Sequence, residues 1–163
     1  MSNRSTFTTV ERLNLAENRA RNLRQLLLRA HREMNTVVTA ELARRGYDDI
    51  RLVHSRLLEN LDRDGNSVTV VAQRAQMAKQ AMGTLAKELE NKGYLRRVVD
   101  SNDRRAWILY FTAKGWRLML ETFEIVAEIE RETSMRVGAA QFKALRAGLA
   151  AMSEPSALRS QSD

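Results

Sequence analysis

The chain has 163 residues and no cysteine, and its 27 Lys or Arg outnumber its 20 Asp or Glu. This length fits one domain, or one domain with dimerising extensions, and the absence of cysteine excludes disulfides, thiolate zinc sites and cysteine redox switches. The first residues contain no apolar run, and the longest apolar run, residues 107–111, is too short to span a bilayer. We therefore expect a cytoplasmic protein with no membrane partner.

The positive charge is concentrated in one segment of the chain. Residues 67–117 hold ten Lys or Arg and four Asp or Glu, which is a net charge of +6 out of a total of +7. A surface that is basic only for solubility would spread this charge evenly, so its concentration favours binding to nucleic acid. A membrane surface fits poorly, because no basic amphipathic helix carries exposed aromatic residues.

The N-terminal segment predicts one long helix, capped by Thr8 or Thr9 and running to about Arg45, with Gly46 after it. Apolar residues recur in it at alternating steps of three and four, as in a coiled-coil seam. They are Leu13, Ala16, Ala20, Leu23, Leu27, Ala30, Met34 and Val37. A dimer interface explains this seam better than packing within one small domain, so residues 9–46 are expected to dimerise.

Asp48 and Asp49 are expected to cap a second helix. Its inward positions are Ile50, Val53, Leu57 and Leu61. Residues 62–66 then begin like a calcium loop, but the glycine has the wrong offset, and Gln73 stands where a bidentate Glu is needed. We predict a turn here, and we expect no metal and no cofactor in this protein.

Two short helical patterns follow, Val68–Ala75 and Lys79–Asn91, with only a turn between them. Ser67 is placed to cap the first helix, and Ala72 is small where the two helices must cross. The second helix has one apolar stripe, formed by Met82, Leu85 and Leu89. Its opposite face carries hydrogen-bond donors and positive charges but no carboxylate, which suits the edge of a nucleic acid groove. That face consists of Lys79, Gln80, Gly83, Thr84 and Lys87.

A basic hairpin is predicted directly after these two helices. Gly93 is expected to end the second helix, and residues 94–99 and 106–111 are rich in strand formers. The segment between the strands is entirely polar and predicts a turn with its tip in water. A helix-turn-helix with such a hairpin is a winged helix, which we assign to residues 48–111.

Two helices and a tail complete the chain. Thr112 is expected to cap a helix to about Arg136, with Gly138 after it, and residues 141–152 form the last helix. The first has an apolar face of Trp116, Met119, Leu120, Phe123, Val126 and Ala127, and the second has inward positions Phe142, Leu145, Leu149 and Met152. We assign residues 112–152 to dimerisation and expect the polar tail, residues 153–163, to be disordered.

Three stretches resemble the MarR (multiple antibiotic resistance regulator) family of bacterial transcription factors at the same relative spacing. They are LAKELENKGYLRR, the wing DSNDRRA, and FTAKG after the second strand. The resemblance implies a mainly α fold with a small β-hairpin, whose winged helix-turn-helix is flanked by N- and C-terminal helices that intertwine with a second subunit. The chain departs from the family pattern at Ala78, where a capping Ser or Thr is common, and at Gln76, where a turn Gly is frequent.

The resemblance also assigns roles in the wing. It places Asp103 and Arg105 in the motif where an acid orients an arginine that enters the minor groove, whose narrow A/T form concentrates negative potential. Arg104 points the other way by strand alternation and is expected to meet phosphate; the alternative is that both arginines only solvate a loop. All the expected DNA contacts are Ser67, Lys79, Gln80, Gly83, Thr84, Lys87, Arg97, Asp103, Arg104 and Arg105.

A small-molecule effector is implied by the same resemblance, bound between the first helix, the second helix and the winged helix. The residues expected at this pocket are His31, Met34, Tyr47, Arg51 and His54. The alternative for each histidine is an ordinary position in the core or on the surface.

The expected function is that of a homodimeric, sequence-specific DNA-binding regulator of transcription, a repressor on a palindromic operator that a small-molecule effector releases. One alternative is a protein-interaction adaptor, which has no need of a carboxylate-free recognition face. Another is a non-specific architectural DNA binder, which would show little sequence preference. The sequence contains no nucleophile elbow and no phosphate-binding glycine loop, so we expect no enzyme activity.

Overall fold

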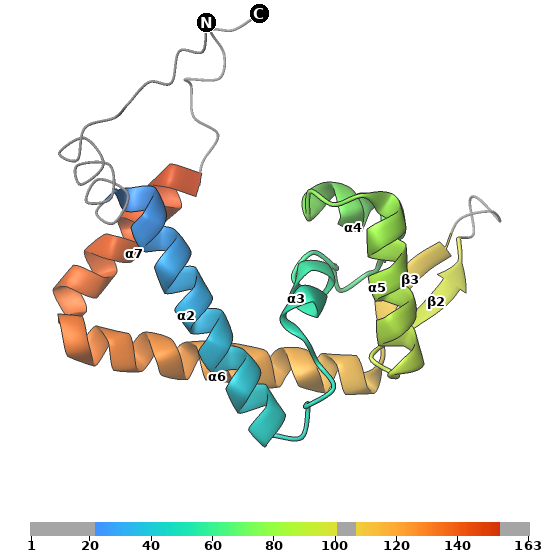
Figure 1. Ribbon diagram of the computed structural model, residues 1–163, viewed down its shortest axis with the longest axis horizontal. Helices are drawn as coiled ribbons and strands as arrows, with labels where there is room; N and C mark the ends of the chain where they lie inside the picture. The colour runs from blue at the N-terminus through green and yellow to red at the C-terminus, as the bar shows by residue number, and fades with distance from the viewer. Residues whose placement is uncertain (1–21, 101–106, 154–163) are drawn as a thin grey trace, which may run out of the picture.

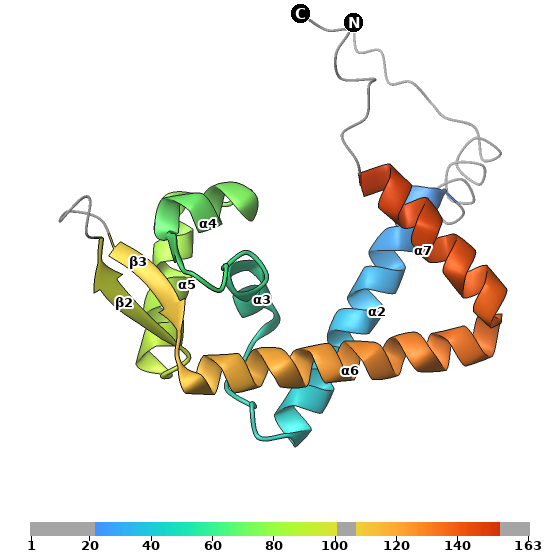
Figure 2. The same ribbon diagram turned by 180° about the vertical axis from the view of Figure 1, so that it is seen from behind.

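The computed structural model describes residues 22–100 and 107–153. In chain order the elements are α2 (Leu23–Arg44), α3 (Leu52–Leu58), β1 (Asn66–Ser67), α4 (Val68–Arg74), α5 (Lys79–Asn91), β2 (Leu95–Val99), β3 (Trp107–Phe111), α6 (Ala113–Val137) and α7 (Ala139–Ser153). Figure 1 shows a winged lobe of α3, α4, α5 and the sheet at one end of α6, with α7 at the other end and α2 crossing α6 between them. Figure 2 shows the same two-armed arrangement from behind.

The long first helix is α2 in the described residues. The Asn22 side chain caps it by accepting a hydrogen bond from the backbone N–H of Gln25 at 3.0 Å. The expected start at Thr8 or Thr9 lies outside the described residues, but the prediction of one uninterrupted helix is wrong, because the backbone of Asn22 is extended (φ −70°, ψ 148°) and the helix begins at Leu23. The C-terminal end agrees with the sequence, since α2 ends at Arg44 and Gly46 follows with φ +90°.

The second helix starts later than expected. Asp48 and Asp49 do not cap α3, which begins at Leu52 with Arg51 as its N-cap. The reason is that Asp49 has other partners: its carboxylate accepts a hydrogen bond from the Tyr94 hydroxyl at 2.6 Å, and its carbonyl accepts one from Lys92 Nζ at 2.6 Å. The loop before α3 is thereby fixed to the segment that connects α5 with β2.

The helix-turn-helix forms as the sequence predicted. The Ser67 hydroxyl caps α4 by accepting a hydrogen bond from the N–H of Val70, and α5 spans the predicted residues. The predicted stripe of α5 is buried, as is Ala72 at the crossing with α4. In the turn between the helices Gln76 has φ +53°, a conformation that a side chain disfavours and that glycine adopts freely.

The sheet has three strands, not the two that the sequence predicted. It is antiparallel, in the order β1-β3-β2, because Asn66 and Ser67 pair with Leu109 and Ile108. In the hairpin, Leu95 pairs with Phe111, and Val99 pairs with Trp107. Of the two extra strand residues predicted, Tyr94 lies before β2 and is fully buried. Ala106 lies outside the described residues.

The core belongs mostly to the winged lobe. From α6 it receives Leu118, Met119 and Ile125, but the predicted apolar face of α6 is largely exposed in the single chain, as Leu120 and Phe123 show. No residue of α7 is buried, although four were expected to point inward. Within one chain the described residues place no further layer over α7 or over this face of α6, so the inward positions of α7 are uncovered and the assignment of both helices to dimerisation stays a prediction. None of the described helices is long and apolar enough to cross a membrane.

Candidate DNA-binding surface

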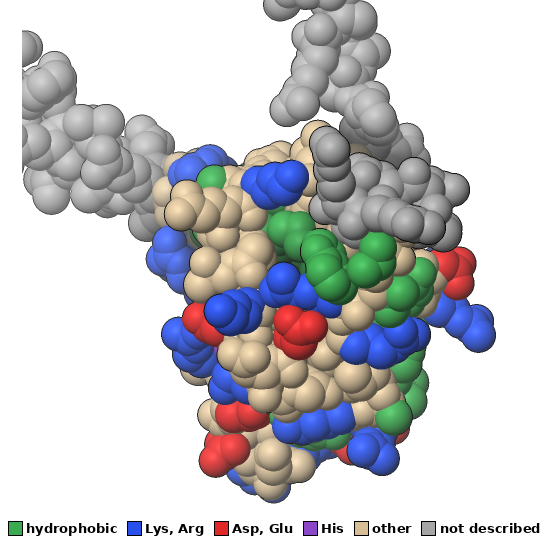
Figure 3. All heavy atoms as spheres, turned by 90° about the vertical axis from the view of Figure 1, so that its right-hand side faces the viewer, with side chains coloured by type: hydrophobic (Ala, Val, Ile, Leu, Met, Phe, Trp, Pro, Cys, Tyr) green, Lys and Arg blue, Asp and Glu red, His purple; other side chains and the backbone are tan. Residues whose placement is uncertain are grey.

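The outward face of α5 carries the five polar, basic and glycine residues that the sequence placed there. Lys79, Gln80, Thr84 and Lys87 are exposed, and Gly83 is partly exposed. Contacts with α3, α4 and β2 hold the opposite face of the helix. Figure 3, which views the side of the winged lobe that carries the wing, shows Lys and Arg side chains spread over it with fewer acidic ones between them.

Both acidic residues of α5 are paired with protein groups beside this face. Glu88 forms an ion pair with Arg51 and accepts a hydrogen bond from His54 Nε2 at 3.0 Å. Glu90 forms an ion pair with Arg97, with 2.9 Å between the carboxylate and Nε. The hydrogen bonds from His54 and Arg51 lower the pKa of Glu88, so these partners stabilise its negative charge. The outward face is left with an uncompensated positive charge.

His54 connects α3 with α5. Its ring is fully buried, and Nδ1 accepts a hydrogen bond from the backbone N–H of Arg51 at 3.1 Å. Because Nδ1 is the acceptor, Nε2 carries the hydrogen that is donated to Glu88. This tautomer fixes the face of α5 relative to α3. Sequence reasoning missed the pairing because His54 and Glu88 are 34 residues apart and no local pattern joins them.

Gly83 lies in the middle of α5, where a helix disfavours glycine. A Cβ added there would meet no heavy atom within 4 Å, so packing within the chain does not require a glycine. Glycine in a helix interior costs about 0.5–1 kcal/mol relative to alanine. What the missing side chain provides is room for a close approach to the helix backbone from outside.

Two of the remaining predicted DNA contacts have partners within the protein. Ser67 is the cap of α4, and Arg97 turns toward Glu90 on α5. The Nε–H of Arg97 has no aligned acceptor, so the contact is an ion pair and not a hydrogen bond. Beside it in β2, the guanidinium of Arg96 lies 4.7 Å from the centre of the Tyr110 ring. Asp103, Arg104 and Arg105 lie outside the described residues.

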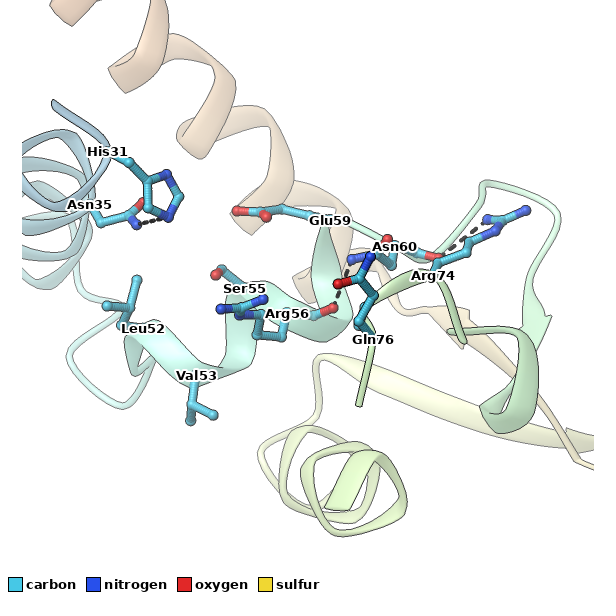
Figure 4. A pocket seen from close by; sticks show the side chains of 11 residues that line it. His31, Asn35, Leu52, Val53, Ser55, Arg56, Glu59, Asn60, Arg74 and Gln76 are labelled. Carbon is cyan, nitrogen blue, oxygen red and sulfur yellow. Dashed lines mark hydrogen bonds between the residues drawn. The ribbon is translucent and has the colours of Figure 1, made fainter. Parts of the chain in front are cut away.

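A cavity of about 450 Å³ lies between α2, α3 and the end of α4 (Figure 4). His31 lines it from α2, where Asn35 Nδ2 is 2.9 Å from His31 Nε2. The other lining residues are Leu52, Val53, Ser55, Arg56, Glu59, Asn60, Arg74, Ala75 and Gln76. Its wall therefore combines two arginines and a histidine with one carboxylate.

The five residues expected at an effector pocket do not come together. Only His31 lines the large cavity, and Arg51 lines a smaller one, of about 60 Å³, between α2, α3 and α6. Met34 lies on α2 and lines neither cavity, and Tyr47 packs against Tyr94 with 6.3 Å between ring centres. His54 is the buried link to Glu88.

No group of three His, Asp or Glu in the described part of the chain could hold a metal ion. In the Asp-rich turn after α3, Asn66 and Arg74 occupy the Asp62 carboxylate, with 3.0 Å to the Asn66 amide and 2.9 Å to the guanidinium.

Comparisons with known proteins agree with this geometry. Residues 48–106 match the model of the MarR family. Among solved structures, E. coli MarR in its apo form has a TM-score of 0.68 at 16% identity, covering 81% of this chain and 96% of that chain. CouR, a transcriptional repressor bound to a 23-mer DNA duplex, has a TM-score of 0.65 at 22% identity, covering 84% and 96%. A mutant of S. aureus MepR bound to an oligodeoxyribonucleotide has a TM-score of 0.57 at 22% identity, covering 80% and 95%. At such identities these structures establish the fold. No curated protein matches the chain in sequence.

Proposed function

We propose that this chain, whose residues 48–106 match the model of the MarR family, is a homodimeric regulator of transcription that binds a specific sequence of duplex DNA. The observation that carries the proposal is the outward face of α5, which presents Lys79, Gln80 and Lys87 while Glu88 and Glu90 are paired with protein groups. Such a face attracts phosphate and offers donors to base edges. Two structurally similar proteins, CouR and the MepR mutant, are bound to DNA in their structures, which supports the same proposed function.

The proposed dimer is supported by apolar side chains that a single chain leaves exposed. They lie on α2, α6 and α7, and include Leu23, Met34, Val37, Leu120, Phe123, Met135, Leu145 and Met152. A second copy covering them would bring two winged lobes into one particle. Two lobes related by a twofold axis read an inverted repeat, so we propose a palindromic operator, with repression by occupancy in the cytoplasm.

We also propose that a small anionic effector relieves the repression by binding in the cavity between α2, α3 and α4. Arg56 and His31 offer donors there, Arg74 lies beside them in an ion pair with Asp62, and among the described lining residues Glu59 is the one acid. A ligand acts by preferring one of two dimer conformations, and the cavity touches both the dimerising α2 and the helix-turn-helix. Such a ligand would favour the conformation whose α5 helices are wrongly spaced for DNA.

The experiment that tests the function is selection of bound sequences from random duplex DNA with the purified full-length protein. We expect a short inverted repeat to be enriched, as a sequence-specific dimer requires. Binding without enrichment would indicate an architectural DNA binder, and the absence of binding would indicate a protein-interaction adaptor.

A further inference from the structure

The β2–β3 hairpin carries an apolar pair on the same sheet face as α5. Side chains alternate between the two faces of a strand, so the pairs Leu95–Phe111, Arg97–Leu109 and Val99–Trp107 share one face. The first of these pairs is buried, and in the second Leu109 is buried while Arg97 reaches Glu90 of α5. This face is therefore the one that packs against α5, and Val99 and Trp107 continue it outward.

The outermost pair of this face is apolar but uncovered. The exposed fraction is 48% for Trp107 and 43% for Val99, although both side chains are large and apolar. Two such side chains directly opposite each other form a patch, and tryptophan is enriched where one surface binds another. An indole suits a mixed surface because its carbons pack on apolar groups while its N–H donates a hydrogen bond.

The positive charge around the Val99–Trp107 patch indicates a negatively charged partner. On the side of the hairpin that packs against α5, the outward face of this helix carries Lys79 and Lys87. Both acids of α5 are paired, Glu88 with Arg51 and Glu90 with Arg97, so they do not offset these two lysines. Figure 3 shows hydrophobic side chains on this side of the winged lobe, with Lys and Arg side chains and fewer Asp and Glu near them. A partner with a dense negative charge and an apolar component between its charges fits such a surface. The backbone of duplex DNA, with deoxyribose carbons between phosphates, has this composition.

We propose that Trp107 and Val99 bind the sugar–phosphate backbone of the DNA beside the groove that α5 reads. The indole packs on deoxyribose carbons, its Nε1–H donates to a phosphate oxygen, and Val99 supports the ring from the neighbouring strand. The proposal rests on the proposed function, and it adds an apolar, sequence-independent contact to the electrostatic ones.

Such a contact has a signature that differs from that of a lysine. Removing a phosphate-neutralising lysine lowers the slope of log affinity against log salt by roughly 1, because one counterion fewer is released. Removing an apolar contact lowers the affinity equally at every salt concentration and leaves the slope unchanged. We expect Trp107→Ala to lower the affinity for DNA about tenfold with an unchanged slope. Lys79→Ala should lower the slope.

The hairpin offers a matched pair of control variants. Val98 and Val99 are neighbours of the same residue type with similar exposure, 38% and 43%, but they lie on opposite faces of β2. Binding of a fluorescein-labelled duplex, measured by anisotropy at several salt concentrations, should therefore weaken in Val99→Ala and not in Val98→Ala. Equal affinities of Trp107→Ala and the wild type would overturn the proposal, as would a lowered slope in Trp107→Ala.

A fluorescence measurement tests the contact without mutating Trp107. The chain has two tryptophans, so Trp116→Phe leaves Trp107 as the only one. On addition of unlabelled duplex we expect its emission to shift to shorter wavelength and its quenching by acrylamide to decrease. Emission that DNA leaves unchanged, although anisotropy shows binding, would contradict the contact and leave the proposed function intact. Protection that rises with protein concentration in the absence of DNA would assign the patch to self-association. If the wild type binds no duplex, the proposed function fails and the contact fails with it.

Discussion

At the scale of single residues, Gly83 separates the requirements of folding from those of binding. The added methyl group meets nothing within the chain, so alanine is compatible with the folded helix. We predict that Gly83→Ala raises the free energy of unfolding by about 0.5–1 kcal/mol. It should also weaken DNA binding, because the methyl group stands on the recognition face. Urea denaturation and DNA titration of the same preparation measure both effects. A variant that is more stable and binds DNA as well as the wild type would show that no close approach occurs at Gly83.

Glu88 gives a prediction for pH dependence. Hydrogen bonds from His54 and Arg51 lower its pKa in the folded state below the value of about 4.3 for an unfolded chain. A lowered carboxyl pKa stabilises the fold above the unfolded pKa, and this contribution is lost as the pH falls through the folded pKa. We predict that Glu88→Gln is less stable than the wild type at pH 7 and that the difference shrinks below about pH 4. Urea denaturation of both proteins across this range measures the difference. A stability difference independent of pH would contradict the assignment of the charge.

Asp103 and Arg105 lie outside the described residues, and their prediction depends on the resemblance of the wing sequence to the MarR family. If the acid orients the arginine for the minor groove, Asp103→Ala weakens DNA binding although it removes a negative charge. Electrostatics alone requires the opposite result. We predict weaker binding for Asp103→Ala, and a larger loss for Arg105→Ala than for Arg104→Ala, in titrations at one fixed salt concentration. Tighter binding by Asp103→Ala would leave the oriented arginine without support.

At the scale of elements, Arg45 joins the end of α2 to α6. Its guanidinium reaches Glu121 at 2.6 Å, Glu124 at 3.3 Å and Glu128 at 3.4 Å, and its Nε reaches Glu41 at 3.2 Å. Hydrogen bonds with Glu121 and Glu41 raise its pKa further above the range in which it could lose its charge.

We predict that Arg45→Met lowers the melting temperature, because four carboxylates then face one another without a cation, and that 1 M salt restores part of the loss by screening their repulsion. Arg44→Met is the matched control, since Arg44 is exposed and pairs only with Glu41 among the described residues. Equal melting temperatures for the two variants, at low and at high salt, would show that the cluster does not stabilise the α2–α6 contact.

The sequence predicted an element well where its signals are local. For α5, a stripe with helical spacing and a following glycine lie within the helix and directly after it, so both of its ends were predicted correctly. The start of α3 was wrong because Asp49 is bound by Tyr94 and Lys92, which are distant in sequence. The strand β1 was missed because two residues are too short to show alternation. The recognition face was predictable from its spacing, whereas the ion pairs that neutralise Glu88 and Glu90 depend on tertiary contacts.

At the scale of the whole molecule, the long helices carry apolar residues that a single chain leaves exposed and that a dimer would bury. Within one chain, α6 gives one side to the core and leaves the other exposed, and α7 buries no residue at all. Figure 1 shows that α7 and the N-terminal part of α2 form an arm that stands away from the winged lobe, so that lobe does not cover them. Exposed apolar residues on three helices are unfavourable in water, and association with a second copy removes them from it.

Phe123 tests this association most directly, because its ring is 60% exposed on α6 and its replacement leaves the core of the winged lobe intact. We predict that Phe123→Asp converts a dimer into a monomer, since an unpaired carboxylate buried in an apolar interface costs several kcal/mol. Sedimentation at micromolar concentration measures the change, with Val98→Asp on the wing as a control that should remain dimeric. Binding to an inverted repeat should fall by roughly 10²–10⁴-fold in the same variant, because two half-sites are no longer bound by one particle. Circular dichroism should show that the helices persist. A wild-type protein that sediments as a stable monomer, or a Phe123→Asp variant that remains dimeric, would contradict the assembly and with it the twofold operator.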